Sequence, residues 1–172
     1  MKNNLKTLLK NTLAILFISL VTISCNNDDD DNNSVTPIPT ADDFLMAKVN
    51  GVQYNATGFE VTASRKTNGG VQIFTTIATG TQIQMYVDNV AAVGTYPTTS
   101  VGSNPFAKMA VVTGSPAVLY ESGECTTSGV LTITSISSTE ITGTFSFTAA
   151  TIGGACPRPT KTITEGSFKT PL

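Results

Sequence analysis

Side chains alternate between apolar and polar types through most of residues 44–172, and no window there keeps a period of 3.6 residues. The segment from Thr81 to Asp88 is typical, since Ile83 and Met85 alternate with glutamines and end on the acidic side chain. Successive side chains of a β-strand point to opposite faces of the sheet, so this period indicates half-buried strands. We therefore expect an all-β domain.

Turn signals separate the alternating segments. Asn50-Gly51 predicts a tight hairpin turn because both of its positions favour positive φ, Asn68-Gly69-Gly70 predicts a second turn, and Gly94–Pro97 is expected to close a later hairpin. The predicted strands, in chain order, are Phe44–Val49, Val52–Tyr54, Phe59–Arg65, Val71–Thr79, Thr81–Asp88, Phe106–Thr113, Gly129–Ser135, Glu140–Ala149 and Thr160–Lys169. This spacing predicts a single antiparallel β-sandwich, or a flattened barrel, of about nine short strands.

The first 24 residues read as an export signal. Lysines at positions 2, 6 and 10 precede an apolar stretch from Leu13 to Ile23, which is shorter than the roughly 20 residues of a membrane span. We expect three parts: a lipoprotein signal peptide (1–24), a lipidated cysteine with an acidic run and a flexible, disordered linker (25–43), and the β-domain (44–172).

The end of the apolar stretch resembles a lipobox, in which a small residue precedes a cysteine that is acylated before cleavage. Thr22-Ile23-Ser24-Cys25 matches through Ser24 and Cys25, whereas the usual leucine is replaced by Thr22. The resemblance implies lipidation of Cys25, and each acyl CH₂ buried in a membrane contributes about 0.8 kcal/mol. The alternative is an ordinary secretory signal followed by an unrelated cysteine.

Four aspartates, Asp28, Asp29, Asp30 and Asp31, follow this cysteine. The run resembles the acidic export signal of surface lipoproteins of Bacteroidota, which implies display on the outer face of the outer membrane. Two other interpretations stay open. The run could be a solvated, self-repelling spacer, or a weak Ca²⁺ site built from carboxylate oxygens.

The composition excludes several function classes. Charged residues make up 13% of the chain, against about 25% in an average protein, and the net charge is −2. We expect no nucleic-acid partner, because phosphate recognition needs a clustered basic face. The chain has no histidine, which is the commonest general base and metal ligand, and we expect no cofactor and no metal site.

Cys125 and Cys156 are the cysteines that remain after lipidation of Cys25. In an exported protein such a pair most often forms a disulfide, which we predict here. The chain-entropy estimate gives a stabilisation of roughly 3–4 kcal/mol for a loop of this length. A metal or redox pair is the alternative, although no histidine is present to complete a metal site.

The sequence gives little indication of a catalytic site. Glycoside hydrolysis needs two opposed carboxylates, and nucleophilic catalysis without histidine would need a serine–lysine pair, but no spacing singles out either. The available carboxylates of the domain are Glu60, Asp88, Glu121, Glu124, Glu140 and Glu165. We therefore expect a protein that is not an enzyme.

Aromatic side chains beside amides and carboxylates are typical of sugar-binding β-domains. The domain has no tryptophan, and its tyrosines are Tyr54, Tyr86, Tyr96 and Tyr120. Tyr86 is predicted to face outward between Gln84 and Asp88, which makes these three residues the candidate ligand face. The simpler interpretation is that Tyr86 is a surface residue of the sheet with no role in binding.

Several motifs occur in a familiar order. They are Ala47–Gly51, Gly80–Val87 with Gly94–Tyr96, Ser128–Ile133, Ile141–Phe147 and Gly166–Phe168. Together they resemble an uncharacterised family of small Bacteroidota lipoproteins with an all-β domain. The resemblance covers nearly the whole domain and implies an all-β fold and an envelope location, but no catalytic residues.

These features favour a lipid-anchored protein of the outer membrane, expected at the cell surface, that binds a glycan, peptide or protein without catalysis. The membrane would be contacted through the N-terminal lipid. A structural or accessory lipoprotein of an envelope complex is the second hypothesis, and a hydrolase is the third.

Overall fold

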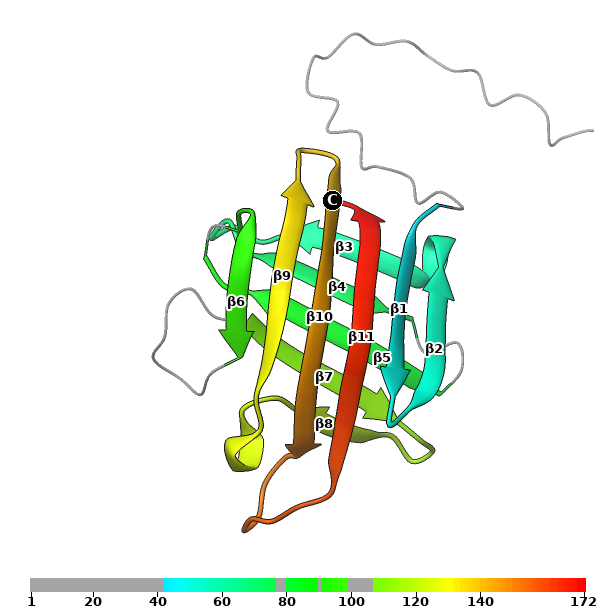
Figure 1. Ribbon diagram of the computed structural model, residues 1–172, viewed down its shortest axis with the longest axis vertical. Helices are drawn as coiled ribbons and strands as arrows, with labels where there is room; N and C mark the ends of the chain where they lie inside the picture. Colours follow the sequence, from blue (N-terminus) through cyan, green and yellow to red (C-terminus); the bar gives the residue numbers. More distant parts are fainter. Residues whose placement is uncertain (1–41, 77–79, 90, 99–106) are drawn as a thin grey trace, which may run out of the picture. The chain divides into compact units, whose positions relative to one another are not determined.

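The computed structural model describes residues 42–76, 80–89, 91–98 and 107–172, without the side chains of Ala107, Lys108 and Thr126 (Figure 1). Of these described residues, 65% lie in strands and 4% in helices. The fold is therefore all-β and antiparallel, as predicted. The predicted signal peptide, Cys25, the aspartates at 28–31 and the predicted linker as far as residue 41 lie outside the described residues.

Eleven strands and two 3₁₀ turns are found in the described residues. The strands are β1 (Phe44–Val49), β2 (Val52–Thr57), β3 (Val61–Arg65), β4 (Val71–Thr75), β5 (Thr81–Val87), β6 (Gly94–Thr98), β7 (Ala107–Thr113), β8 (Val118–Glu121), β9 (Gly129–Ile136), β10 (Glu140–Thr151) and β11 (Thr160–Pro171). The 3₁₀ turns are η1 (Gly58–Glu60) and η2 (Glu124–Thr126).

The strands form two layers of one hydrogen-bonded sheet that is nearly closed into a barrel. The front sheet has the order β2-β1-β11-β10-β9-β6, and the back sheet has the order β8-β7-β5-β4-β3. Figure 1 shows the back strands running obliquely from side to side behind the nearly vertical front strands. Strand β10 joins the layers, because it pairs with β9 and β11 along most of its length and with β8 at its end.

The core fills the space between the two sheets. Its largest fully buried side chains come from both layers and are Leu45, Ile73, Ile83, Met85, Met109, Leu131, Ile133, Ile141, Ile163 and Phe168. Each such side chain contributes about 1.5–3 kcal/mol on burial relative to exposure. The predicted alternation is confirmed in β5, where Ile83 and Met85 are at most 1% exposed, and in β10, where Ile141 and Phe145 are buried.

Three phenylalanines of the front sheet lie directly opposite glycines on neighbouring strands. The pairs are Phe145 with Gly166, Phe147 with Gly129 and Phe168 with Gly143. A Cβ at Gly166 would lie 2.6 Å from the ring of Phe145, and the other two glycines leave no more room. The absent side chains at Gly166 and Gly143 leave room for the rings of Phe145 and Phe168, a recognised way of packing an aromatic residue on a strand glycine. At Gly129 the close atoms of Phe147 are its Cα and Cβ.

The turn at Asn50-Gly51 is confirmed, with φ of 49° and 81°. Asn50 also ties this turn to β11, because its backbone N–H donates to the Thr162 carbonyl oxygen and its Oδ1 accepts from the Thr162 N–H, each at 2.8 Å. The first hairpin therefore forms where its residues predict it, and it is anchored by a contact that is remote in the sequence.

The prediction for Phe59 is wrong. The strand begins at Val61 rather than at Phe59, and the phenylalanine side chain is 72% exposed. Gly58 has φ of 55°, and the Thr57 N–H donates to the Glu60 carboxylate at 3.1 Å. These local contacts form η1, which turns the chain before the strand begins.

The prediction for Gly94–Pro97 is also wrong, since this segment is not the close of a hairpin but strand β6, paired with β9. Strand β6 pairs with β9 and lies at the edge of the front sheet. Proline has no backbone N–H to donate, and Pro97 is tolerated there because an edge strand needs hydrogen bonds on only one side. Strand β8 was not predicted at all. The count of strands therefore rises above the expected nine to eleven in the described residues.

Candidate binding face

Gln84 and Tyr86 lie on the outer face of the back sheet, as predicted. Both are half-buried, because β5 is an interior strand with β4 on one side and β7 on the other. Asp88 follows directly after the end of β5. An interior strand holds its outward side chains more firmly than an edge strand or a loop, so the candidate residues stand on a rigid support.

The pairing of the strands brings further polar groups to the same place. Gln72 of β4 lies opposite Tyr86, while Ala110 of β7 lies opposite Gln84 on one side and Glu121 of β8 on the other. Ala110 is small and buried, which leaves a hollow of about 90 Å³. The residues that line it are Gln72, Gln84, Met85, Tyr86, Ala110 and Glu121.

Hydrogen bonds fix the tyrosine at the edge of this hollow. The Tyr86 hydroxyl donates to Asp88 Oδ1 at 3.0 Å, and Asn68 Nδ2 donates to the same oxygen at 2.7 Å. Asn68 in turn accepts the Gly70 N–H through its Oδ1 at 3.0 Å. Asp88 thus positions Tyr86 and the preceding turn, whereas Gln84 Nε2 donates along the strand to Gln82 Oε1 at 2.7 Å.

The sequence did not indicate Gln72, Glu121 or Asn68 as part of this face. Their membership follows from strand register, which one sequence does not reveal. Alternation alone could have placed Gln72 outward, because the neighbouring Val71 and Ile73 are buried. Glu121 is the last residue of β8, a strand that the sequence did not predict.

The other tyrosines have different surroundings. Tyr54 and Tyr96 are buried, with exposures of 8% and 4%, so they cannot serve as ligand platforms. The Tyr54 hydroxyl donates to Thr75 Oγ1 at 2.6 Å, and burial raises the pKa of this phenol above its ordinary value. Tyr120 is half-buried, and the Lys161 ammonium lies 5.6 Å from its ring centroid.

Most of the carboxylates considered for hydrolysis are engaged in structural contacts. Glu165 accepts from Lys48 at 2.8 Å, Glu140 lies 3.4 Å from the Lys169 ammonium, and Glu124 pairs with Arg158. Within the described ranges, no group of three or more aspartate, glutamate, cysteine or histidine side chains is placed to hold a metal ion.

A second hollow of about 240 Å³ lies on the outer face of the front sheet. Small hydroxyl side chains of β10, β11 and the residue before β9 dominate its lining, together with Gly129, Phe147 and Ile163. The hydroxyl residues are Ser128, Ser146, Thr148, Thr162 and Thr164. Its larger volume comes without an amide or carboxylate side chain, so it offers less directional hydrogen bonding than the hollow beside Tyr86.

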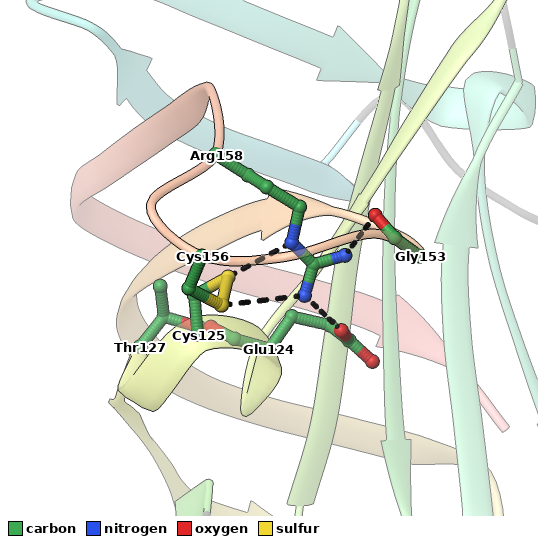
Figure 2. Close-up of polar contacts among 6 residues, drawn as sticks. All are labelled: Glu124, Cys125, Thr127, Gly153, Cys156 and Arg158. Atoms are coloured by element: carbon green, nitrogen blue, oxygen red, sulfur yellow. Dashed lines mark hydrogen bonds and ion pairs between the residues drawn. A yellow bond between two sulfur atoms is a disulfide. The ribbon is translucent and has the colours of Figure 1, made fainter.

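The predicted disulfide is confirmed. Cys125 in η2 is bonded to Cys156 in the connection between β10 and β11, with a sequence separation of 31 residues. Figure 2 shows the bond beside Arg158 and Glu124. The disulfide joins the segment after β8 to the segment after β10, next to the place where these two strands pair.

The fold and the polar face define a small, disulfide-bonded, antiparallel β-domain. Residues 42–170 match the family described as "Domain of unknown function (DUF6252)", and the chain belongs to this family, which is uncharacterised. No curated protein and no solved structure matches the chain. Among the described residues, none of the helices has the length and apolar character needed to cross a membrane.

Proposed function

We propose that this protein is a non-catalytic binding module of the bacterial envelope that takes a glycan on the outer face of its back sheet. The observation that carries the proposal is the hollow in which Gln72, Gln84 and Glu121 surround a small alanine floor beside an oriented Tyr86. Amides donate and accept hydrogen bonds, a carboxylate accepts two hydroxyls, and a tyrosine ring offers an apolar surface to a sugar.

The size of the hollow sets the expected affinity. A volume of about 90 Å³ holds part of one sugar unit, so most of a bound oligosaccharide would lie along the open sheet surface. We therefore expect weak binding by a single domain. Many copies held on one membrane would raise the avidity by 10²–10⁴, in order of magnitude, without a new contact.

The membrane anchor belongs to the same proposal. The lipobox resemblance at Cys25 and the aspartates that follow support a lipoprotein of Bacteroidota type at the cell surface. Protease treatment of intact cells tests this, with the wild type beside Cys25→Ala and a variant in which Asp28–Asp31 become Asn. Cleavage of the wild type and protection of the aspartate-free variant are expected. A protected wild type would contradict outward display.

The glycan proposal is tested by binding of the mature chain, made without the lipid as Cys25→Ser, to an array of neutral and acidic oligosaccharides. We expect Tyr86→Ala and Gln84→Ala each to weaken binding about tenfold, because each removes a contact worth roughly 1 kcal/mol or more. Thr95→Ala is the matched control, since Thr95 is exposed on β6 of the front sheet.

Two outcomes would contradict this assignment. Equal losses in Tyr86→Ala and Thr95→Ala would mean that the back sheet is not the binding face. If the protein bound none of the oligosaccharides, a glycan would be excluded as the ligand. Peptide or protein ligands would then be tested on the same variants.

The accessory-lipoprotein hypothesis calls for a broad apolar patch. Within the part of the chain that the structure describes, the exposed large apolar residues come from separate segments of the sequence, and exposed apolar side chains are ordinary on a protein surface. They are Met46, Val52, Phe59, Val93, Val118, Val130 and Ile152. This distribution favours the binding module.

A further inference from the structure

The Cys125–Cys156 disulfide has an arginine packed against it. Arg158 Nε donates to Cys125 Sγ at 2.8 Å, whereas the contact of Nη2 with Cys156 Sγ is longer, at 3.8 Å (Figure 2). The same guanidinium donates to the Gly153 carbonyl oxygen at 2.8 Å and to the Glu124 carboxylate at 2.5 Å. The charge is therefore held in place, and it lies nearer to one sulfur than to the other.

The two cysteines also differ in exposure. Cys156 is exposed, Cys125 is half-buried, and the Arg158 side chain is only 10% exposed. An external thiol can therefore reach Cys156 more easily. The charge next to Cys125 is poorly screened by water, so its effect on that sulfur is strong.

A cation next to a sulfur stabilises the thiolate form, and a stable thiolate is the better leaving group in thiol–disulfide exchange. We propose that the Cys125–Cys156 bond is a thiol-exchange site with a fixed direction, in which an external thiolate attacks Cys156 Sγ and Cys125 leaves as a thiolate beside Arg158. Reactive cysteines generally occupy such partly exposed, electropositive surroundings.

The reaction balances with a dithiol as the reductant. Its thiolate forms a bond to Cys156 Sγ, and the electron pair of the broken disulfide moves to Cys125 Sγ. The second thiol of the dithiol, as its thiolate, then attacks the mixed disulfide and releases Cys156. The dithiol is oxidised to a disulfide, and the protein disulfide is reduced to two cysteines.

A purely structural role for Arg158 makes the opposite prediction. If the guanidinium only holds the 152–159 connection against η2, its removal loosens the disulfide and speeds reduction. If it stabilises the leaving thiolate, its removal slows reduction. Glu124 offsets part of the positive charge, so neutralising Glu124 should speed reduction in the proposed mechanism.

The test measures the rate of reduction by dithiothreitol in the full chain carrying Cys25→Ser, which leaves only this pair of cysteines. We expect Arg158→Gln to slow reduction about tenfold and Glu124→Gln to speed it severalfold. Arg65→Gln is the control for net charge, because Arg65 is exposed and donates to the Ser137 carbonyl oxygen instead.

A second measurement needs no substitution of Arg158 or Glu124. Brief exposure of the same chain to glutathione, followed by alkylation and mass mapping, should place the adduct on Cys156. An adduct mainly on Cys125, faster or unchanged reduction of Arg158→Gln, or an equal slowing by Arg65→Gln would each overturn the proposal.

Discussion

Strand β10 belongs to two regions that are held together in different ways. Against β11 it runs through ten paired positions, with phenylalanine rings packed on glycines between them. Against β8 it has two paired positions, Ala150 with Glu121 and Thr151 with Tyr120, which we call the seam. The disulfide lies just beyond the seam. The front sheet thus depends on close packing, whereas the junction of the two sheets is short and has a covalent link beside it.

Gly143→Val should have the largest effect. A Cβ at this position would collide with the Thr132 carbonyl oxygen and lie 2.6 Å from Phe168 Cζ. We expect a loss of unfolding free energy beyond the 1–3 kcal/mol usual for overpacking, measured as a lower urea midpoint.

Two further variants make this prediction specific. Gly153→Ala should cost much less, because a Cβ there meets nothing within 4 Å and only the positive φ of 75° is strained. Adding Phe168→Leu to Gly143→Val should not restore stability, because the obstructing Thr132 oxygen belongs to the backbone. Full rescue would show that the ring alone excludes the side chain.

Replacing both disulfide cysteines with serine should have the next largest effect. The chain-entropy estimate for a 31-residue separation is about 3–4 kcal/mol. Hydrogen exchange should then quicken first in Val118–Glu121 of β8, while amides of Gly143–Phe147 keep their protection. Uniform acceleration in both segments would contradict the division into two regions.

Tyr54→Phe should have an intermediate effect on stability. It removes one hydrogen bond between the front and back sheets. Tyr54 of β2 donates to Thr75 of β4, whose Oγ1 also accepts the Ile83 N–H at 3.0 Å. We expect a loss of about 1 kcal/mol at neutral pH from the missing hydrogen bond. Thermal unfolding beside the wild type measures it.

The same variant should change the response to alkali. Burial raises the pKa of Tyr54 in the folded protein, with a smaller opposing effect of the Thr75 hydrogen bond. Folding therefore favours the protonated phenol. Its contribution is complete below about pH 10, the unfolded value, and is lost as pH rises through the folded value. The wild type should lose its advantage over Tyr54→Phe in that range, and a constant difference would contradict this.

Lys48→Ala should have the smallest effect. Its ammonium pairs with Glu165 across β1 and β11 at 2.8 Å, but the two side chains are 38% and 66% exposed. Exposed pairs contribute about 0–1 kcal/mol. We expect a change under about 0.5 kcal/mol in the urea-derived free energy, and a larger loss would mean that the front sheet depends on surface charge as well as packing.

Local patterns were sufficient to predict nine of the eleven described strands, but not β6, β8 or the order of the strands. The turn at Asn50-Gly51, the buried set of β5 and the cysteine pair follow from residue type and spacing alone. Phe59 and β6 were predicted wrongly because a hydrogen bond from Thr57 and pairing with β9 decide their structure. Such contacts leave little trace in a short window of sequence.

The candidate face was predicted in part for the same reason. Alternation placed Gln84 and Tyr86 outward on one strand, but Gln72 and Glu121 join them only through the register of neighbouring strands. The arginine beside the disulfide was not foreseen either. Arg158 is two residues from Cys156 in the sequence, yet it makes its shorter contact with the sulfur of Cys125. The residues around Arg158 in the sequence give no sign of that contact.

The position of β1 has a mechanical consequence. The chain enters the described domain through this strand, which is hydrogen bonded to β2 on one side and to β11 on the other. Chain ends fray unless a sheet ties them down. A pull applied at the start of β1 would have to break both rows of pairing before the domain could open from this end.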